Sequence, residues 1–138
     1  MTEIRTGTPA DLGAVLAFWR LAGDPSPTDS EEALAQLLDR DPEALLLADP
    51  GDRLVGTLIA AWDGWRGSLY RLAVHPRHRR DGIATALVRA GEERLRRAGA
   101  VRLTAIVVDG DAAAAGLWAA AGYERQSERA RFVRMLDG

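Results

Sequence analysis

The stretch from Leu69 to Ala98, LYRLAVHPRHRRDGIATALVRAGEERLRRA, determines how the rest of the chain is organised. In its first part, Tyr70, Leu72 and Val74 alternate with smaller or charged residues, which is the period of a β-strand. Pro76 has no backbone N–H to give to a sheet, so the strand is predicted to end near His75. A short basic turn follows it.

The second part of the stretch predicts a long amphipathic helix that Gly99 terminates. Its apolar face is predicted to contain Ile83, Leu87, Ala90, Gly91, Arg94, Leu95 and Ala98, and its polar face Arg89, Glu92, Glu93, Arg96 and Arg97. A strand, a tight turn and a helix therefore follow one another without a long loop.

The turn before this helix has the chemistry of an anion site. The first N–H groups of a helix have no partner within the helix, and the helix dipole adds to their attraction for an anion. Gly82 has no Cβ to keep an anion from the backbone, and Arg79 and Arg80 add charged donors. A pyrophosphate fits this chemistry, although on these six residues alone an ordinary solvated basic loop fits equally well.

Length and composition restrict the classes of protein that fit. The chain has 138 residues, a net charge of −2, no cysteine and two histidines, and all its basic residues other than histidine are arginine. These values indicate a single domain with its own core, and they exclude a disulfide framework and cysteine chemistry. The histidines have no carboxylate pair at ligand spacing, so no metal site is expected. No apolar run approaches a membrane span and no signal peptide is visible, so we expect a cytoplasmic protein without a membrane partner.

Periodicity elsewhere extends the pattern to the whole chain. Strands are predicted at Glu3–Thr6, Ala44–Ala48, Arg53–Trp62, Leu69–His75, Val101–Val108, Tyr123–Gln126 and Arg131–Leu136, with helices at Thr8–Ala22, Ser30–Asp39, Ile83–Ala98 and from Asp111 to about Ala121. The second to fourth strands should form an antiparallel meander. The crossover through the long helix should be parallel, which makes the strands at Leu72 and Ile106 neighbours.

Two blocks of residues give the chain a resemblance to a known family. Arg79-Arg80-Asp81-Gly82-Ile83-Ala84 fits the pattern Arg/Gln-x-x-Gly-x-Gly/Ala, and Asp111 to Tyr123, DAAAAGLWAAAGY, has the spacing Asn-x-x-Ala-x-x-Leu-Tyr-x-x-x-Gly-Phe. With these blocks in this order, the whole chain resembles the GNAT family of N-acetyltransferases. The resemblance implies an α/β (α+β) fold: a mixed, mostly antiparallel sheet of about seven strands with helices on both faces, splayed at its central parallel pair.

The resemblance also implies acetyl-CoA as cosubstrate and direct attack of a primary amine on the thioester. The backbone of the strand would pair with the pantetheine arm, and the amide of Leu72 would stabilise the oxyanion, an effect that can be worth ~3 kcal/mol. The pyrophosphate would lie at the turn, where the side chain of Asp81 must face away from it. The residues implied to bind the cofactor are Leu72, Ala73, Val74, Arg79, Arg80, Asp81, Gly82, Ile83, Ala84, Asp111 and Trp118.

The catalytic acid is not evident, because Trp118 replaces the tyrosine that many relatives use. An indole N–H donates a hydrogen bond but has no usable proton, whereas a thiol with a pKa near ~8.5 can leave as the thiolate. Trp118 is predicted either to pack against the pantetheine arm or to be an ordinary core residue. Asp111 stands where the family usually has asparagine.

The identity of the general base is also undecided, because the strand has no carboxylate where some relatives have glutamate. Tyr70 shares the strand parity of Leu72 and is one candidate; Asp63, Glu124 and water are the others. Tyr123 fits a packed strand better than a catalytic role. His75 and His78 are expected to be turn and surface residues.

The acceptor is expected to lie between the first two helices, the loop over residues 23–29 and the hairpin at Trp62–Trp65. The alternative for Trp62 and Trp65 is that they pack at the sheet edge or in a dimer contact. The sequence does not identify the acceptor, and a homodimer is possible. An acyl-CoA-binding module without catalysis remains the alternative. A nucleic-acid binder is disfavoured by the net charge and by acidic residues among the arginines, and a P-loop by the lack of lysine.

Overall fold

The computed structural model describes residues 3–23, 26–107 and 111–136. The chain divides into two units, Met1–Ile106 and Val107–Gly138, and each is described by itself. The single domain over residues 1–138 stays a prediction.

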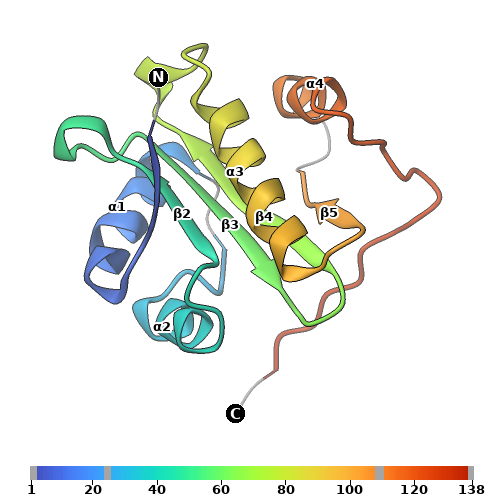
Figure 1. The fold of residues 1–138 in the computed structure, drawn as a ribbon, viewed down its shortest axis with the longest axis horizontal. Helices are drawn as coiled ribbons and strands as arrows, with labels where there is room; N and C mark the ends of the chain where they lie inside the picture. The colour runs from blue at the N-terminus through green and yellow to red at the C-terminus, as the bar shows by residue number, and fades with distance from the viewer. Residues whose placement is uncertain (1–2, 24–25, 108–110, 137–138) are drawn as a thin grey trace. The chain divides into compact units, whose positions relative to one another are not determined.

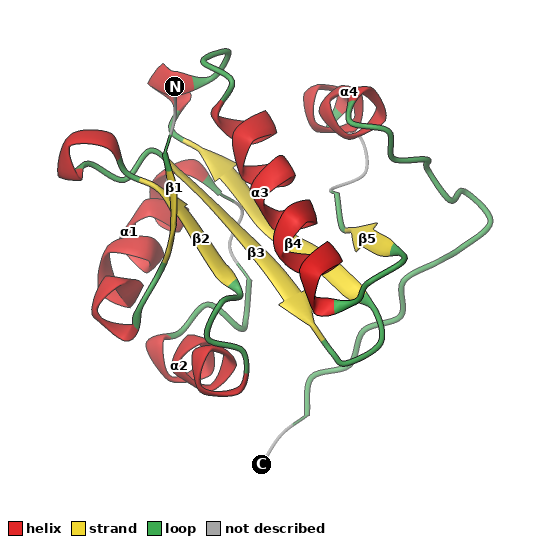
Figure 2. Ribbon diagram, viewed as in Figure 1, coloured by secondary structure: helices red, strands yellow, loops and turns green. Residues whose placement is uncertain are grey.

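The first unit is built on a five-stranded mixed sheet (Figure 2). Its strands β1 (Ile4–Thr6), β2 (Leu45–Ala48), β3 (Gly56–Trp62), β4 (Gly67–Val74) and β5 (Leu103–Ala105) lie in the order β1-β2-β3-β4-β5. The first three pairings are antiparallel, and β4 pairs with β5 in parallel. This order confirms the predicted meander and the parallel crossover between β4 and β5.

Helices lie on both faces of this sheet (Figure 1). The helix α3 (Ile83–Ala98) packs on one face, where a Cβ added to Gly91 would lie 3.0 Å from Leu58. On the other face α1 (Leu12–Ala22) places Trp19, whose Nε1 donates to Thr57 Oγ1 at 2.8 Å. Consecutive residues of a strand point to opposite faces, so Thr57 and Leu58 show that β3 is covered on both sides.

Capping residues set the boundaries of the helices. The helix α2 (Glu31–Arg40) begins after Ser30, whose side chain accepts from the N–H of Ala33 at 3.1 Å. The helix α3 ends at Gly99, which has a φ of 115°. Short 3-10 turns, each opened by a proline, precede α1 and follow β2 and β4: η1 (Pro9–Asp11), η2 (Pro50–Asp52) and η3 (Pro76–His78). The strand β4 thus ends at Val74, two residues before Pro76 and next to His75, where the sequence predicts its end.

A β-bulge interrupts β4 at Arg71. Thr57 pairs with Ala73 and Ile59 pairs with Tyr70, so two steps along β3 correspond to three steps along β4. Arg71 takes up the extra residue with a φ of 57°. The prediction that Tyr70 shares the parity of Leu72 is therefore wrong: the register places Tyr70 on the face of Ala73, because a bulge reverses the alternation that follows it.

The second unit contains one helix in its described part, α4 (Ala112–Ala120). Asp111 caps this helix by accepting a hydrogen bond from the N–H of Ala114 at 3.0 Å. Gly122 ends it with a φ of 98°, and the N–H of Tyr123 donates to the carbonyl of Trp118 at 3.0 Å. This is the Schellman arrangement, in which a glycine adopts the left-handed conformation that other residues avoid.

The predicted strands at Tyr123–Gln126 and Arg131–Leu136 are wrong, and the described residues form five strands rather than about seven. Among the described residues no ladder pairs these two segments, and Phe132 is 94% exposed. A short segment with β-prone side chains does not specify a partner strand, and without a partner its backbone groups have no ladder to join. The strand predicted from Val101 begins instead at Leu103, and its other predicted end, Val108, lies outside the described residues. No helix in the described ranges is both long and apolar enough to cross a bilayer.

Candidate functional site

The turn between β4 and α3 is held by two residues in the left-handed conformation. Arg80 has a φ of 81° and Gly82 a φ of 78°. A Cβ on Gly82 would meet nothing within 4 Å, so the glycine is required by the backbone angle rather than by space. Turns of this kind gather successive N–H groups on one side and form a concave anion site.

Most of the N–H groups in this turn have no acceptor. Among the described residues, the amides of Arg79, Arg80, Gly82, Ile83 and Ala84 donate no hydrogen bond, and α3 has no side-chain cap. The N–H of Asp81 is different, because it donates to the carbonyl of His78 at 3.3 Å. The turn therefore gathers five unused donors at the positive end of a long helix, which is the arrangement that attracts a phosphate.

The charged side chains of the turn also favour an anion. Neither Arg79 nor Arg80 forms an ion pair with a described residue, so both guanidinium groups are available to an anion. The carboxylate of Asp81 lies 3.3 Å from Nδ1 of His78. This contact keeps the only acidic side chain of the turn beside a histidine.

The strand β4 has an open edge next to the turn. The strand β5 pairs only with Gly67, Ser68 and Leu69, and the last bond between them joins the N–H of Ile106 to the carbonyl of Leu69 at 3.4 Å. From Tyr70 to Val74, β4 has β3 on one side and no described strand on the other. Since the side chains of Ala73 and Val74 are buried, this edge offers mainly backbone groups.

The bulge places a cluster of side chains on the α1 face that the sequence analysis missed. Thr57 Oγ1 donates to the carbonyl of Arg71 at 3.0 Å and accepts from Trp19. The guanidinium of Arg71 forms an ion pair with Asp29 and lies 4.5 Å from the centre of the Trp19 ring. The only sequence signal was an arginine within an apolar strand, because its partner is 42 residues away.

The candidate bases do not gather around this edge. Tyr70 is 41% exposed on the α1 face. Asp63 caps the β3–β4 hairpin: its Oδ1 accepts from the N–H of Arg66 at 2.6 Å and of Trp65 at 2.7 Å. These two bonds hold the pKa of Asp63 below its ordinary value, which makes it a turn residue and a weak base. Glu124 is an exposed residue of the second unit.

The predicted residues thus fall into two groups. Leu72, Ala73 and Val74 on β4 run directly into the turn at residues 79–84, and both belong to the first unit. Asp111 and Trp118 belong to the second unit. There Asp111 is the α4 cap, and the buried Trp118 ring packs edge-on against Tyr123, with centroids 5.0 Å apart.

Comparison with known proteins places the chain in a family. Residues 14–123 match the family model "Acetyltransferase (GNAT) family". Acetyltransferase YE1169 of Yersinia enterocolitica is 34% identical over 125 residues, covering 90% of this chain and 89% of that protein. Acetyltransferase ECA0875 of Pectobacterium atrosepticum is 33% identical over 123 residues, covering 88% of this chain and 87% of that protein.

Solved structures show the same fold at low sequence identity. The PaiA N-acetyltransferase of Thermoplasma acidophilum, in complex with coenzyme A, aligns with a TM-score of 0.80 at 18% identity and covers 91% of each chain. Ard1 of Thermoplasma volcanium aligns with a TM-score of 0.78 at 19% identity, covering 91% of this chain and 84% of that one. The match to the family model over most of the sequence, and the identity of 33–34% to acetyltransferases over most of their length, show that this chain belongs to the GNAT family of acetyltransferases.

Proposed function

We propose that the chain transfers the acetyl group of acetyl-CoA to a primary amine, by direct attack of the amine on the thioester. As a GNAT acetyltransferase it uses acetyl-CoA as its cosubstrate. One observation supports the location of the site above all others: the free amides of the turn at residues 79–84 continue directly from the open edge of β4. No other part of the first unit that the structure describes combines these two features.

The residues present fit this cosubstrate. The amides of Arg79, Arg80, Gly82, Ile83 and Ala84 would bind the pyrophosphate, with the two arginine side chains completing the charge balance. The amide of Asp81 is already used within the turn, so of the six predicted residues it is the weakest donor. The open edge at Leu72–Val74 would pair with the amide groups of the pantetheine arm, as an added strand does. This requires the sheet to splay between β4 and β5.

The transfer requires three things of the chain. The attacking amine must lose a proton, the thioester oxygen must be stabilised as it gains charge, and the sulfur must leave with the electrons of the broken C–S bond. The Leu72 amide would supply the stabilisation. The thiolate needs no strong acid, so Trp118 in place of tyrosine is compatible with transfer. Water or Tyr70 would accept the proton of the amine.

A second candidate is an acyl-CoA-binding protein with little catalysis. It is favoured by Asp63, whose carboxylate is committed to its own turn, and by Trp118, which has no proton to transfer. Release of thiol from acetyl-CoA over a panel of primary amines separates the two functions. Binding without thiol release over the whole panel would support the second candidate. The acceptor, a homodimer and a cytoplasmic location all stay predictions.

Calorimetric titration of acetyl-CoA tests the binding site. Gly82→Asp puts a carboxylate where the pyrophosphate is proposed to bind. We expect it to weaken binding by about 100-fold, because the carboxylate repels the anion and a side chain strains a backbone with a φ of 78°. Gly64→Asp is the matched control, because Gly64 also has a positive φ, 93°, and open space for a Cβ. Equal affinity in the two variants would contradict the proposed site.

A further inference from the structure

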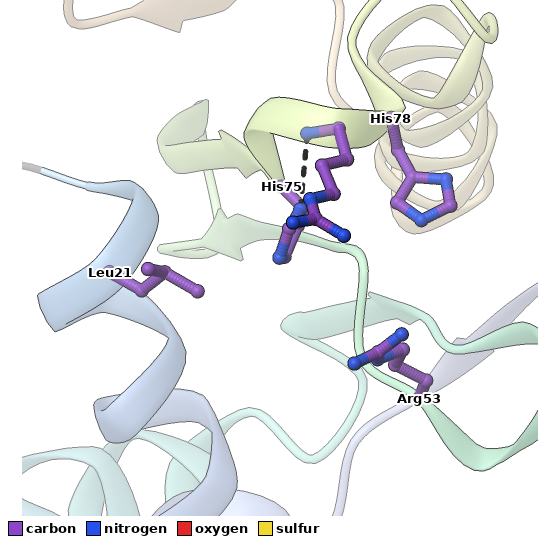
Figure 3. Close-up of a pocket in the computed structure, with 5 residues that line it drawn as sticks. Leu21, Arg53, His75 and His78 are labelled. Atoms are coloured by element: carbon purple, nitrogen blue, oxygen red, sulfur yellow. Dashed lines mark hydrogen bonds between the residues drawn. The ribbon is translucent and has the colours of Figure 1, made fainter.

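A second basic site lies beside the turn, on the side of α1. A cavity of about 370 Å³ is lined by Leu21, Arg53, His75, Arg77 and His78. Figure 3 shows Leu21 and Arg53 on opposite sides of the open space, with His75 and His78 above it. These residues come from α1, from the segment between η2 and β3, and from η3 with His75, which precedes it, so the cavity exists only in the folded first unit. Its volume admits a small organic molecule rather than a single ion.

The charged side chains that line this cavity are all basic. None of its lining residues is acidic, and the guanidinium groups of Arg53 and Arg77 form no hydrogen bond or ion pair with any described residue. The carboxylate of Asp81 contacts the lining at His78, where it lies 3.3 Å from Nδ1. Two unpaired guanidinium groups facing one cavity match a doubly charged tetrahedral anion, because their planar donor sets bind phosphate oxygens in pairs.

His75 contributes a neutral donor to this group. Burial lowers its pKa, and the positive charges of His78, Arg53, Arg77 and Arg79 lower it further. Its Nδ1 accepts a hydrogen bond from the N–H of Arg77 at 3.1 Å, so the proton of the neutral ring is on Nε2. Nε2 has no partner among the described residues and can donate to an anion.

We propose that this cavity binds a phosphate monoester through the side chains of Arg53, Arg77 and His75. The site differs from the turn, where backbone amides are the donors, and it does not depend on the proposed acetyl transfer. The phosphate has two possible sources, a separate phosphorylated small molecule or the 3′-phosphate of coenzyme A, and the recognition chemistry is the same for both.

The histidines provide a direct readout, because the chain has only two and both line the cavity. Sulfate is the probe: it is tetrahedral and keeps two negative charges at every pH of the titration. We expect sulfate, at constant ionic strength against chloride, to shift the proton resonance of the His75 Cε1–H saturably. A bound anion offsets the surrounding positive charge, so the pKa of His75 should rise and sulfate should bind more tightly at about pH 5 than at about pH 8.

Two substitutions test the role of the side chains. Arg53→Ala should weaken sulfate binding by about 10-fold, because it removes a charge-assisted donor. Arg102→Ala is the control, since Arg102 is an exposed arginine outside the cavity whose side chain has no described partner. The proposal is wrong if sulfate and chloride shift the histidines equally, or if the two variants bind sulfate as the wild type does.

A competition experiment identifies the source of the phosphate. If coenzyme A displaces sulfate from the cavity but dephospho-coenzyme A does not, the site binds the cofactor's own 3′-phosphate. If sulfate binds equally in the presence of saturating coenzyme A, the site takes a separate phosphorylated molecule. A failure of acetyl-CoA to bind in calorimetry would contradict the proposed function but would leave the sulfate result intact, so the two proposals fail separately.

Discussion

The two ends of β4 differ in almost every respect, although they belong to one strand of eight residues. At the closed end, Gly67–Leu69 pairs with both β3 and β5. At the open end, from Tyr70 to Val74, only β3 is paired, and the strand then enters the turn before α3. The closed end is packed: a Cβ on Gly67 would lie 2.6 Å from Leu103. The open end has the bulge and the unused amides.

The two ends differ in backbone strain, which is concentrated at the open end, and in their expected contribution to stability, which is larger at the closed end. Among the described residues, three other than glycine have a positive φ, and two of them, Arg71 and Arg80, lie at the open end or in its turn. Such residues cost about 1 kcal/mol or more each and persist when the surrounding structure holds them. Each end also has an arginine–aspartate pair, Arg94 with Asp41 at the closed end and Arg71 with Asp29 at the open end. We expect the first pair to hold the fold and the second to shape the site.

The largest expected effect is on stability, at the closed end. Asp41 pairs with Arg94, whose side chain is only 9% exposed, and also accepts from the N–H of Trp62 at 3.0 Å. Asp41→Ala leaves a buried guanidinium unpaired, so the free energy of unfolding should fall by about 3–5 kcal/mol. Urea denaturation measures this change.

The control for Asp41 is an exposed ion pair on the same helix. Glu93 and Arg96 are 56% and 70% exposed, and Glu93→Ala should cost less than about 1 kcal/mol. If Asp41→Ala lowers the free energy of unfolding by no more than Glu93→Ala does, the ion pair at the closed end does not stabilise the fold.

The next effect is at the open end, where Arg71 pairs with Asp29 of the loop that is predicted to line the acceptor site. Arg71→Gly keeps the positive φ but removes the ion pair with Asp29 and the contact with Trp19. We expect the KM for the amine to rise about 10-fold, as expected for a lost charged contact, with acetyl-CoA affinity unchanged. The unfolding free energy should fall by no more than about 1 kcal/mol, because relief of backbone strain offsets part of the loss.

Asp52 provides the matched control, since it is exposed and has a φ of 64°. Asp52→Gly relieves the same kind of strain without touching the bulge, and it should leave the KM for the amine unchanged. If the KM for the amine rises in both variants, or in neither, the bulge at Arg71 does not shape the acceptor site.

The smallest expected effect is on turnover, at Tyr70. The register places its side chain on the α1 face, away from the parity of Leu72. If water is the base, Tyr70→Phe should change kcat by less than about 3-fold, whereas removal of a positioned base costs about 100-fold or more. Steady-state rates with one amine from the thiol-release panel distinguish these results, and a loss of the larger size would make Tyr70 the general base.

The features that could be predicted from the sequence depend on neighbouring residues. Pro76, Gly82 and Gly99 mark local changes of backbone, so β4, its turn and the limits of α3 could be predicted from neighbouring residues. The helical spacing also placed Arg94 on the buried face of α3. Its partner Asp41 is 53 residues away and leaves no local signal.

The features that escaped prediction all depend on distant partners. Alternation over Leu69–His75 does not show an extra residue, so the bulge at Arg71 and the altered face of Tyr70 appear only when β3 is paired. Likewise, Arg131–Leu136 was predicted to be a strand, but no described strand pairs with it. Asp63 was considered as a base because a sequence does not show that two amides already bind its carboxylate.

Amide hydrogen exchange with and without acetyl-CoA reports on each end of β4 separately. We expect new protection at the open end and in the turn, over residues 72–74 and 79–84. The amides of Gly67–Leu69, already packed in the sheet, should stay unchanged. If saturating acetyl-CoA leaves the open end and the turn unprotected, or protects only other segments, acetyl-CoA does not bind along the open end of β4.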